Sequence, residues 1–98
     1  MIEIRKKPRA EADLVEIWKR TLERWGEAQA DAYVEEIARA IEALAEYPRL
    51  GAKCDWLRKG YRRLSVNHHH VYYTIADRHI EIIRILFERM DAERQLEE

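Results

Sequence analysis

Alternating apolar and polar residues at the start of the chain predict a short β-strand. Ile2 and Ile4 flank Glu3, and the strand is expected to end at Pro8, because proline has no N–H to donate to a neighbouring strand. From residue 10 to residue 25 the apolar residues follow a helical spacing. The apolar stripe of this first helix contains Leu14, Trp18, Leu22 and Trp25. Both tryptophans are therefore predicted to lie in the core.

A second amphipathic helix is predicted directly after Gly26, which stands where a glycine commonly ends a helix. Pro48 closes this second helix. Its apolar residues recur at spacings of three and four, and they are Ala30, Tyr33, Val34, Ile37, Ile41 and Leu44. Two amphipathic helices joined through one glycine predict an antiparallel helix hairpin, which needs a surface on which to bury its apolar stripes.

The second half of the chain predicts strands. Residues 49–59 have no clear period and are interpreted as a loop, but after Gly60 the period becomes two. Three strands are expected, at about 62–66, 70–75 and 80–87, with a tight turn at Asp77-Arg78 between the last two. The order β-α-α-β-β-β predicts an α+β fold. In it the N-terminal strand and the helix hairpin pack on a mostly antiparallel sheet, within a single domain spanning 1–98.

The last predicted strand is apolar on both faces, which is unusual for a sheet with helices on one side. Simple alternation places Ile80, Ile82 and Leu86 on one face together with Arg84, and it places Ile83, Ile85 and Phe87 on the other. A second apolar face needs a cover. The cover is expected to be either the C-terminal tail of the chain or another protein.

Composition excludes some classes of protein. The chain has 98 residues with 18 Lys and Arg against 19 Asp and Glu, so it lacks the overall basic surplus of a dedicated nucleic-acid binder. Cys54 is the single cysteine and cannot form an internal disulfide, which favours a reducing, cytoplasmic compartment. No signal peptide is visible, and no apolar run approaches the roughly 20 residues of a spanning helix, so no membrane association is expected.

Several short motifs, taken in order, resemble the ParE branch of the RelE/ParE toxin superfamily. The final run from Ile82 to Asp91 resembles the family's closing Arg-Ile-Leu-x-x-Arg-Met-Asp pattern. The other matching segments are Ala12-Asp13-Leu14, Ile17-Trp18, Trp25-Gly26, Gln29-Ala30, Tyr33, Tyr47-Pro48-Arg49-Leu50-Gly51 and Gly60-Tyr61-Arg62. The resemblance covers nearly the whole chain, from about residue 2 to residue 96.

This resemblance implies the toxin of a type II toxin–antitoxin module. Its expected partner is a ParD-like antitoxin with a DNA-binding N-terminal part and a disordered tail that folds along the toxin. Operator DNA is then contacted only through the antitoxin. The implied target is DNA gyrase, which ParE toxins as a group trap on cleaved DNA to block replication, and no cofactor is implied.

RelE relatives instead cut mRNA, a reaction that needs a base, an acid and cations that hold the phosphate. Arg62 and Arg84 match the two arginine positions of those nucleases. Each is interpreted as a phosphate clamp, as a dock for an acidic antitoxin residue, or as a structural ion pair. Phe87 stands where relatives often carry histidine, and Met90-Asp91 replaces a terminal tyrosine. No catalytic residues are therefore expected.

Further candidates for contact with the antitoxin or the target lie in the second half. Arg89 and Met90, together with Arg84, are expected to face the target. Lys53 is either a solvated loop charge or a phosphate-binding residue, and Trp56 is either packed under its loop or an exposed anchor. The segment 49–63 contains six cations and one acid, which indicates a solvated loop or an electrostatic dock for an acidic tail or gyrase-bound DNA.

The run His68-His69-His70 invites a metal-site interpretation. Adjacent strand residues point to opposite faces, so at most two of these histidines share a face, and a zinc site needs three or four ligands. A polar hairpin connection is predicted, with no metal. Two other functions stay open at this point: a RelE-like ribosome-dependent mRNA endonuclease, and an inactive toxin that serves only in an autoregulatory complex.

Overall fold

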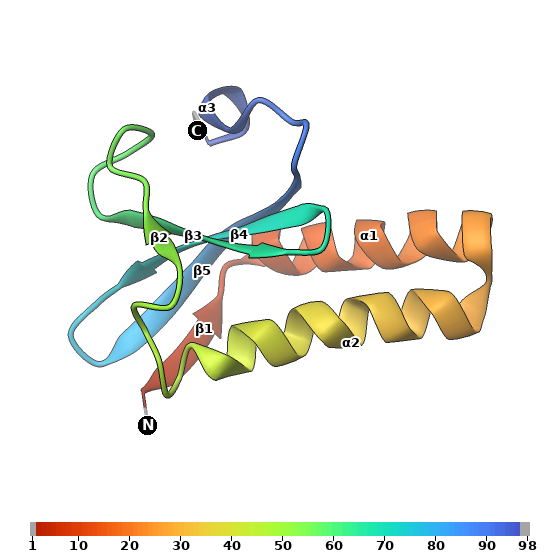
Figure 1. The fold of residues 1–98 in the computed structure, drawn as a ribbon, viewed down its shortest axis with the longest axis horizontal. Coiled ribbons are helices and arrows are strands. Elements are labelled where there is room, and N and C mark those ends of the chain that lie inside the picture. Colours follow the sequence, from red (N-terminus) through yellow and green to blue (C-terminus); the bar gives the residue numbers. More distant parts are fainter. Residues whose placement is uncertain (1, 97–98) are drawn as a thin grey trace.

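A helix hairpin and a short C-terminal helix lie on opposite faces of a five-stranded sheet (Figure 1). The structure is a computed structural model and describes residues 2–96. The elements are β1 (Glu3–Lys6), α1 (Pro8–Trp25), α2 (Glu27–Ala43), β2 (Ala52–Lys53), β3 (Tyr61–Val66), β4 (His69–Ile75), β5 (His79–Phe87) and α3 (Ala92–Gln95). The predicted α+β fold with a helix hairpin on a mostly antiparallel sheet is confirmed.

The helix hairpin turns through a single residue. Gly26 has φ +90°, a left-handed value that side chains disfavour; its N–H donates to Leu22 O and its carbonyl accepts from Ala30 N, each at 3.0 Å. It therefore ends α1 and begins α2. Pro8 is the first residue of α1, where its fixed φ suits the helix and its missing N–H costs nothing.

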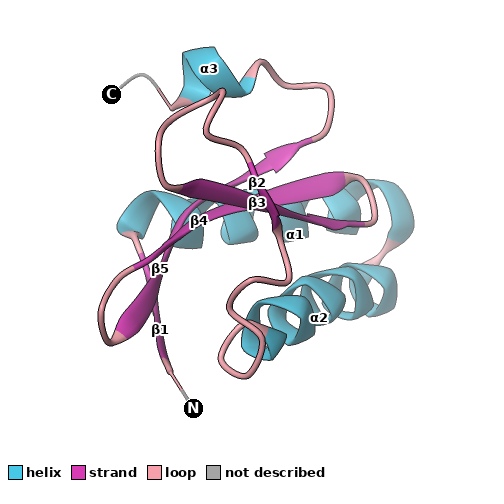
Figure 2. Cartoon of the chain, turned by 60° about the vertical axis from the view of Figure 1, so that its left-hand side comes forward, coloured by secondary structure: helices cyan, strands magenta, loops and turns pink. Residues whose placement is uncertain are grey.

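The strand order is β1-β5-β4-β3-β2, with β1 parallel to β5 and every other pair antiparallel (Figure 2). The apolar–polar pattern of the sequence did not predict β2, because two residues are too few to show a period. This strand pairs Ala52 with Arg63 and Lys53 with Arg62. The segment predicted as loop is thus partly an edge strand.

A β-bulge in β5 overturns the predicted faces of the last strand. Tyr72 pairs with Arg84 but Tyr73 pairs with Ile82, so Ile83 is an extra residue in the ladder. Arg84 consequently lies on the face opposite Ile82. The prediction that Ile82, Arg84 and Leu86 share one face was wrong, because alternation holds only in a strand without a bulge.

Two apolar clusters pack on the two faces of the sheet. The larger cluster lies under the helix hairpin, and its buried residues are Ala10, Ile17, Ile37, Ile41, Leu44, Val71, Tyr73, Ile80, Ile82 and Ile85. The smaller cluster consists of Cys54, Tyr72, Leu86 and Leu96. Leu96 directly follows α3 and is only 7% exposed. The chain's own C-terminal segment therefore covers the second face, which was one of the two expected covers.

The two tryptophans of α1 differ in burial. Trp18 is half-buried and its indole Nε1 donates to Asp31 Oδ1 of α2 at 2.8 Å. Trp25 is 70% exposed, so its predicted place in the core was wrong. The reason is visible in Figure 1: the hairpin tip projects past the sheet, and Trp25 is the last residue of α1.

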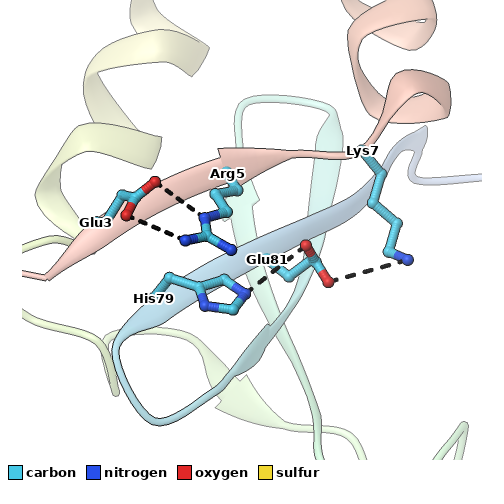
Figure 3. Close-up of polar contacts among 5 residues, drawn as sticks. All are labelled: Glu3, Arg5, Lys7, His79 and Glu81. Atoms are coloured by element: carbon cyan, nitrogen blue, oxygen red, sulfur yellow. Dashed lines mark hydrogen bonds and ion pairs between the residues drawn. The ribbon is translucent and has the colours of Figure 1, made fainter.

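Charged side chains line the β1 edge of the sheet (Figure 3). Arg5 Nε lies 2.9 Å from Glu3 Oε2, and Glu81 lies 3.9 Å from Lys7 Nζ and 3.8 Å from His79 Nε2. Exposed pairs of this kind add little stability, but charges on an edge strand discourage pairing with other strands. Of the helices within residues 2–96, none combines the length and apolarity needed to cross a membrane.

Candidate protein-binding surfaces

Arg84 is engaged inside the protein. Its Nε and Nη2 donate to the two carboxylate oxygens of Asp13 at 2.8 and 3.0 Å, and its Nη1 donates to the carbonyl of Gln95 at 3.1 Å. Asp13 Oδ2 also accepts a hydrogen bond from the backbone N–H of Ile85 at 2.9 Å. Ile85 lies in β5 past the last residue that pairs with β1. The side chain of Arg84 therefore joins α1, β5 and α3, as in the structural ion pair that was one of its interpretations.

Arg62 is also occupied, in this case by backbone carbonyls. Its Nη1 donates to Gly51 O at 2.7 Å and to Arg49 O at 3.4 Å. The hydroxyl of Tyr73 accepts from Gly51 N at 2.9 Å and donates to Pro48 O at 2.8 Å. Arg62 and Tyr73 together fix the connection between α2 and β2. Burial is the main cause that raises the pKa of Tyr73 above its usual value of 10.0.

Lys53 and Trp56 lie at the β2–β3 edge, on the far side of the sheet from β1. Lys53 is exposed and stands directly opposite Arg62 in the strand register. Trp56 is 65% exposed, and the guanidinium carbon of Arg63 lies 5.8 Å from its ring centre. Trp56 is therefore exposed and is not packed under its loop. Lys53 and Trp56 thus lie together at this edge, and β4 separates β3 from β5, the strand that carries Arg84.

A groove lies between α1 and the end of β5. Its volume is about 720 Å³. Three of its apolar side chains are exposed: Trp25 by 70%, Phe87 by 40% and Met90 by 44%. The full lining is Asp13, Glu16, Ile17, Arg20, Thr21, Glu23, Arg24, Trp25, His69, Ile85, Leu86, Phe87 and Met90. Such a combination of an apolar floor with charged walls suits an amphipathic helix or peptide.

His69 lines the groove, whereas the sequence analysis considered it only as a possible metal ligand. Its Nδ1 lies 2.7 Å from the hydroxyl of Tyr33, and its ring meets the rings of Tyr33 and Phe87 edge-on, both at 5.5 Å. Burial is the main cause that lowers the pKa of His69 below its usual value of 6.5. Strand pairing could have indicated this residue, because His69 is the direct partner of Phe87, which stands where relatives often carry a histidine.

The neighbouring histidines have partners of their own. His68 Nδ1 lies 3.3 Å from Glu88 Oε1, and His70 Nδ1 lies 3.0 Å from Ser65 Oγ. The hairpin turn consists of Asn67, with φ +54°, and His68, so β4 begins one residue earlier than predicted. Within residues 2–96, no group of three His, Cys, Asp or Glu side chains is placed to hold a metal ion.

Arg89 and Met90 follow β5 in a turn closed by the hydrogen bond from Met90 N to Phe87 O at 2.9 Å. Both side chains are exposed, and Met90 lines the groove. The candidates from the sequence therefore form three sets. Met90 belongs to the groove, and Arg89 is exposed in the same turn but is not part of the groove lining. Lys53, Arg62 and Trp56 belong to the β2–β3 edge, and Arg84 belongs to the interior.

Known proteins resemble this chain over almost its whole length. The family model described as the ParE toxin of the type II toxin-antitoxin system, parDE, matches residues 4–92. Toxin ParE1 of Mycobacterium tuberculosis (strain ATCC 25618 / H37Rv) is 43% identical over 90 residues, which are 91% of this chain and 92% of that protein. Toxin ParE1 of Caulobacter vibrioides is 43% identical over 88 residues, 90% and 91% of the two chains.

A solved structure supports the fold. The chromosomal ParDE TA system from P. aeruginosa matches with a TM-score of 0.80 at 22% sequence identity, over 89% of this chain and 96% of that chain. Together with the family match and the 43% identity to the two toxins, the observations lead to one assignment. The chain belongs to the family of ParE toxins of type II toxin–antitoxin systems.

Proposed function

We propose that this ParE-family toxin is neutralised by a ParD-like antitoxin whose tail binds in the groove between α1 and β5. The observation that carries this proposal is the exposed apolar floor of the groove, formed by Trp25, Phe87 and Met90. Exposed aromatic and methionine side chains are enriched where proteins bind one another. The walls of the groove carry both signs of charge, with Arg20 paired to Glu16 and with Arg24 and Glu23 beside them, and they suit a tail whose polar face also carries both signs.

The proposed target is DNA gyrase, which the toxin inhibits by binding as a protein. This part of the proposal derives from family membership, and the segment after β5 is the proposed contact. Arg89 is exposed there and belongs to the run that resembles the family pattern. Removing the whole tail is a poor test of this contact, because Leu96 covers Cys54, Tyr72 and Leu86. Arg89→Glu changes the exposed side chain alone.

The proposed mechanism has no catalytic step. A ribonuclease needs cations that are free to hold a phosphate as its charge develops. Two observations argue against that role here: both carboxylate oxygens of Asp13 hold Arg84, and backbone carbonyls hold Arg62. Phe87 has no proton to give to a leaving oxygen. These features favour inhibition by binding alone.

A ribosome-dependent mRNA endonuclease is the second candidate, and His69 is the observation that favours it. This histidine lies beside Phe87 in the groove, and an imidazole can transfer a proton. Its Nδ1, however, is already placed against the hydroxyl of Tyr33. If the endonuclease function is correct, His69→Gln abolishes toxicity. Under the main proposal this variant stays toxic.

Induction in a host without the antitoxin tests the proposal. We expect growth arrest with intact transcripts and with halted DNA synthesis, and we expect co-expressed antitoxin to restore growth. Transcripts cut at codon positions would establish the endonuclease instead. Harmless expression of the folded chain would favour an inactive toxin that serves in an autoregulatory complex.

A further inference from the structure

Positive charge without acidic partners is concentrated at the β2–β3 edge. Between residues 49 and 63 the chain has six cations, Arg49, Lys53, Arg58, Lys59, Arg62 and Arg63, and one acid, Asp55. Within the described residues, none of these six forms an ion pair with a carboxylate, although other cations of the chain do. The carboxylate of Asp55 instead accepts from Gly60 N at 2.8 Å. A net charge of −1 for the whole chain conceals this local excess.

The geometry of the edge places cations together. Lys53 and Arg62 are direct cross-strand partners, an arrangement of like charges that destabilises a sheet unless an anion lies nearby. They line a hollow of about 570 Å³ together with Lys59, Tyr61, Gly60 and Asp55, and the carboxylate of Asp55 already accepts from Gly60 N. Lys53 and Lys59 are both exposed to solvent. The hollow is therefore suited to bind phosphate groups.

An exposed aromatic ring lies beside these charges. Trp56 is 65% exposed in the loop between Lys53 and Lys59, and Arg63 lies over its ring. The loop is held in shape by the hydrogen bond from Gly60 N to Asp55. Proteins that bind single-stranded nucleic acid combine a positively charged track for the backbone with aromatic rings on which bases stack. Both parts occur together at this edge.

We propose that the β2–β3 edge binds single-stranded nucleic acid, with phosphates at Lys53 and Lys59 and a base stacked on Trp56. This contact goes beyond the proposed function, which requires only protein partners. Trp56 distinguishes single-stranded nucleic acid from other polyanions as the ligand. A peptide of acidic residues alone has no flat ring to stack on the indole, and a duplex keeps its bases stacked inside.

Fluorescence anisotropy with a labelled dT12 oligonucleotide tests the proposal on the full chain. We expect saturable binding that weakens with salt, since the counterions of the bound phosphates are released. The double variant Lys53→Gln/Lys59→Gln should reduce the slope of log affinity against log salt by about 1.4, since each phosphate contact contributes about 0.7 on a single strand. Trp56→Ala should weaken binding about tenfold, the effect of losing one stacked base.

A matched control separates this site from general charge effects. Lys6→Gln/Lys19→Gln removes the same charge from exposed positions on β1 and α1 and should leave the slope unchanged. Similar binding of rU12, with the same sensitivity to Trp56→Ala, supports the proposal for both kinds of single strand. Three results overturn it: no saturable binding at low salt, tighter binding of duplex or of a twelve-glutamate peptide, or equal losses in the control variant.

Discussion

Asp13 and Arg84 are 71 residues apart in the sequence and form a two-point ion pair, with N–O distances of 2.8 and 3.0 Å. Their side chains are 15% and 10% exposed, so the pair is largely withdrawn from water. Asp13 reaches β5 at Ile85, just past the last residue that β1 pairs. The pair therefore completes the edge of the sheet and ties it to α1.

Asp13→Ala should lower the free energy of unfolding by about 3 kcal/mol, because it leaves the guanidinium of Arg84 buried without its partner. Urea unfolding followed by circular dichroism measures this change. Glu16→Ala is the control, since it breaks an exposed pair with Arg20 on the same helix and should cost less than about 1 kcal/mol. Equal losses in the two variants would show that Asp13 has no special structural role.

Gly51→Ala should destabilise the protein by about 1–3 kcal/mol through overpacking. An added Cβ would lie 2.7 Å from ring and hydroxyl atoms of Tyr73 and 2.9 Å from the carbonyl oxygen of Arg63. Gly60→Ala is the comparison: its Cβ meets nothing within 4 Å, but φ is +86°. We expect Gly51→Ala to melt at the lower temperature, and the reverse order would contradict the close packing at Tyr73.

Met90→Glu should weaken binding of the cognate antitoxin by about thirtyfold or more, the effect expected for an anchor residue at a protein interface. Isothermal titration of toxin with the antitoxin tail measures the affinity. Val15→Glu makes the same change on α1 at a residue that is 53% exposed and lies outside the groove. A similar loss for Val15→Glu, or none for Met90→Glu, would place the antitoxin elsewhere.

His69 should make the protein less stable in mild acid. Burial lowers the pKa of His69 in the folded protein below 6.5, so the unfolded chain takes up the proton first as the pH falls. Its contribution to stability is therefore intact above about pH 6.5. The contribution decreases as the pH falls from there toward the lowered pKa of the folded state. The measurement is the unfolding free energy at pH 7.5 and pH 5.5.

The comparison for this pH effect is His69→Gln, which keeps a polar partner for Tyr33 and has no titrating ring. The loss of stability between the two pH values should be smaller in the variant than in the wild type. Part of the loss will persist, because burial also lowers the pKa of His70. An identical loss in both proteins would show that His69 is not buried in its neutral form.

Sequence periodicity predicted the helices and the long strands because each extends over enough residues to repeat. It missed β2, which has two residues, and the bulge at Ile83, because a bulge depends on how two strands pair. Trp25 was misplaced for a similar reason: its spacing matched the apolar stripe, but the sheet ends before the hairpin tip. The groove and the Asp13–Arg84 pair required tertiary structure, since each joins segments far apart in the chain.

Purified toxin, DNA gyrase, ATP and supercoiled plasmid test whether gyrase is the target, with trapped linear DNA as the readout. We expect dose-dependent linear DNA that disappears when antitoxin is added. We also expect less linear DNA with Arg89→Glu at equal toxin concentration. Absence of linear DNA with a toxin that is folded and binds its antitoxin would contradict gyrase as the target.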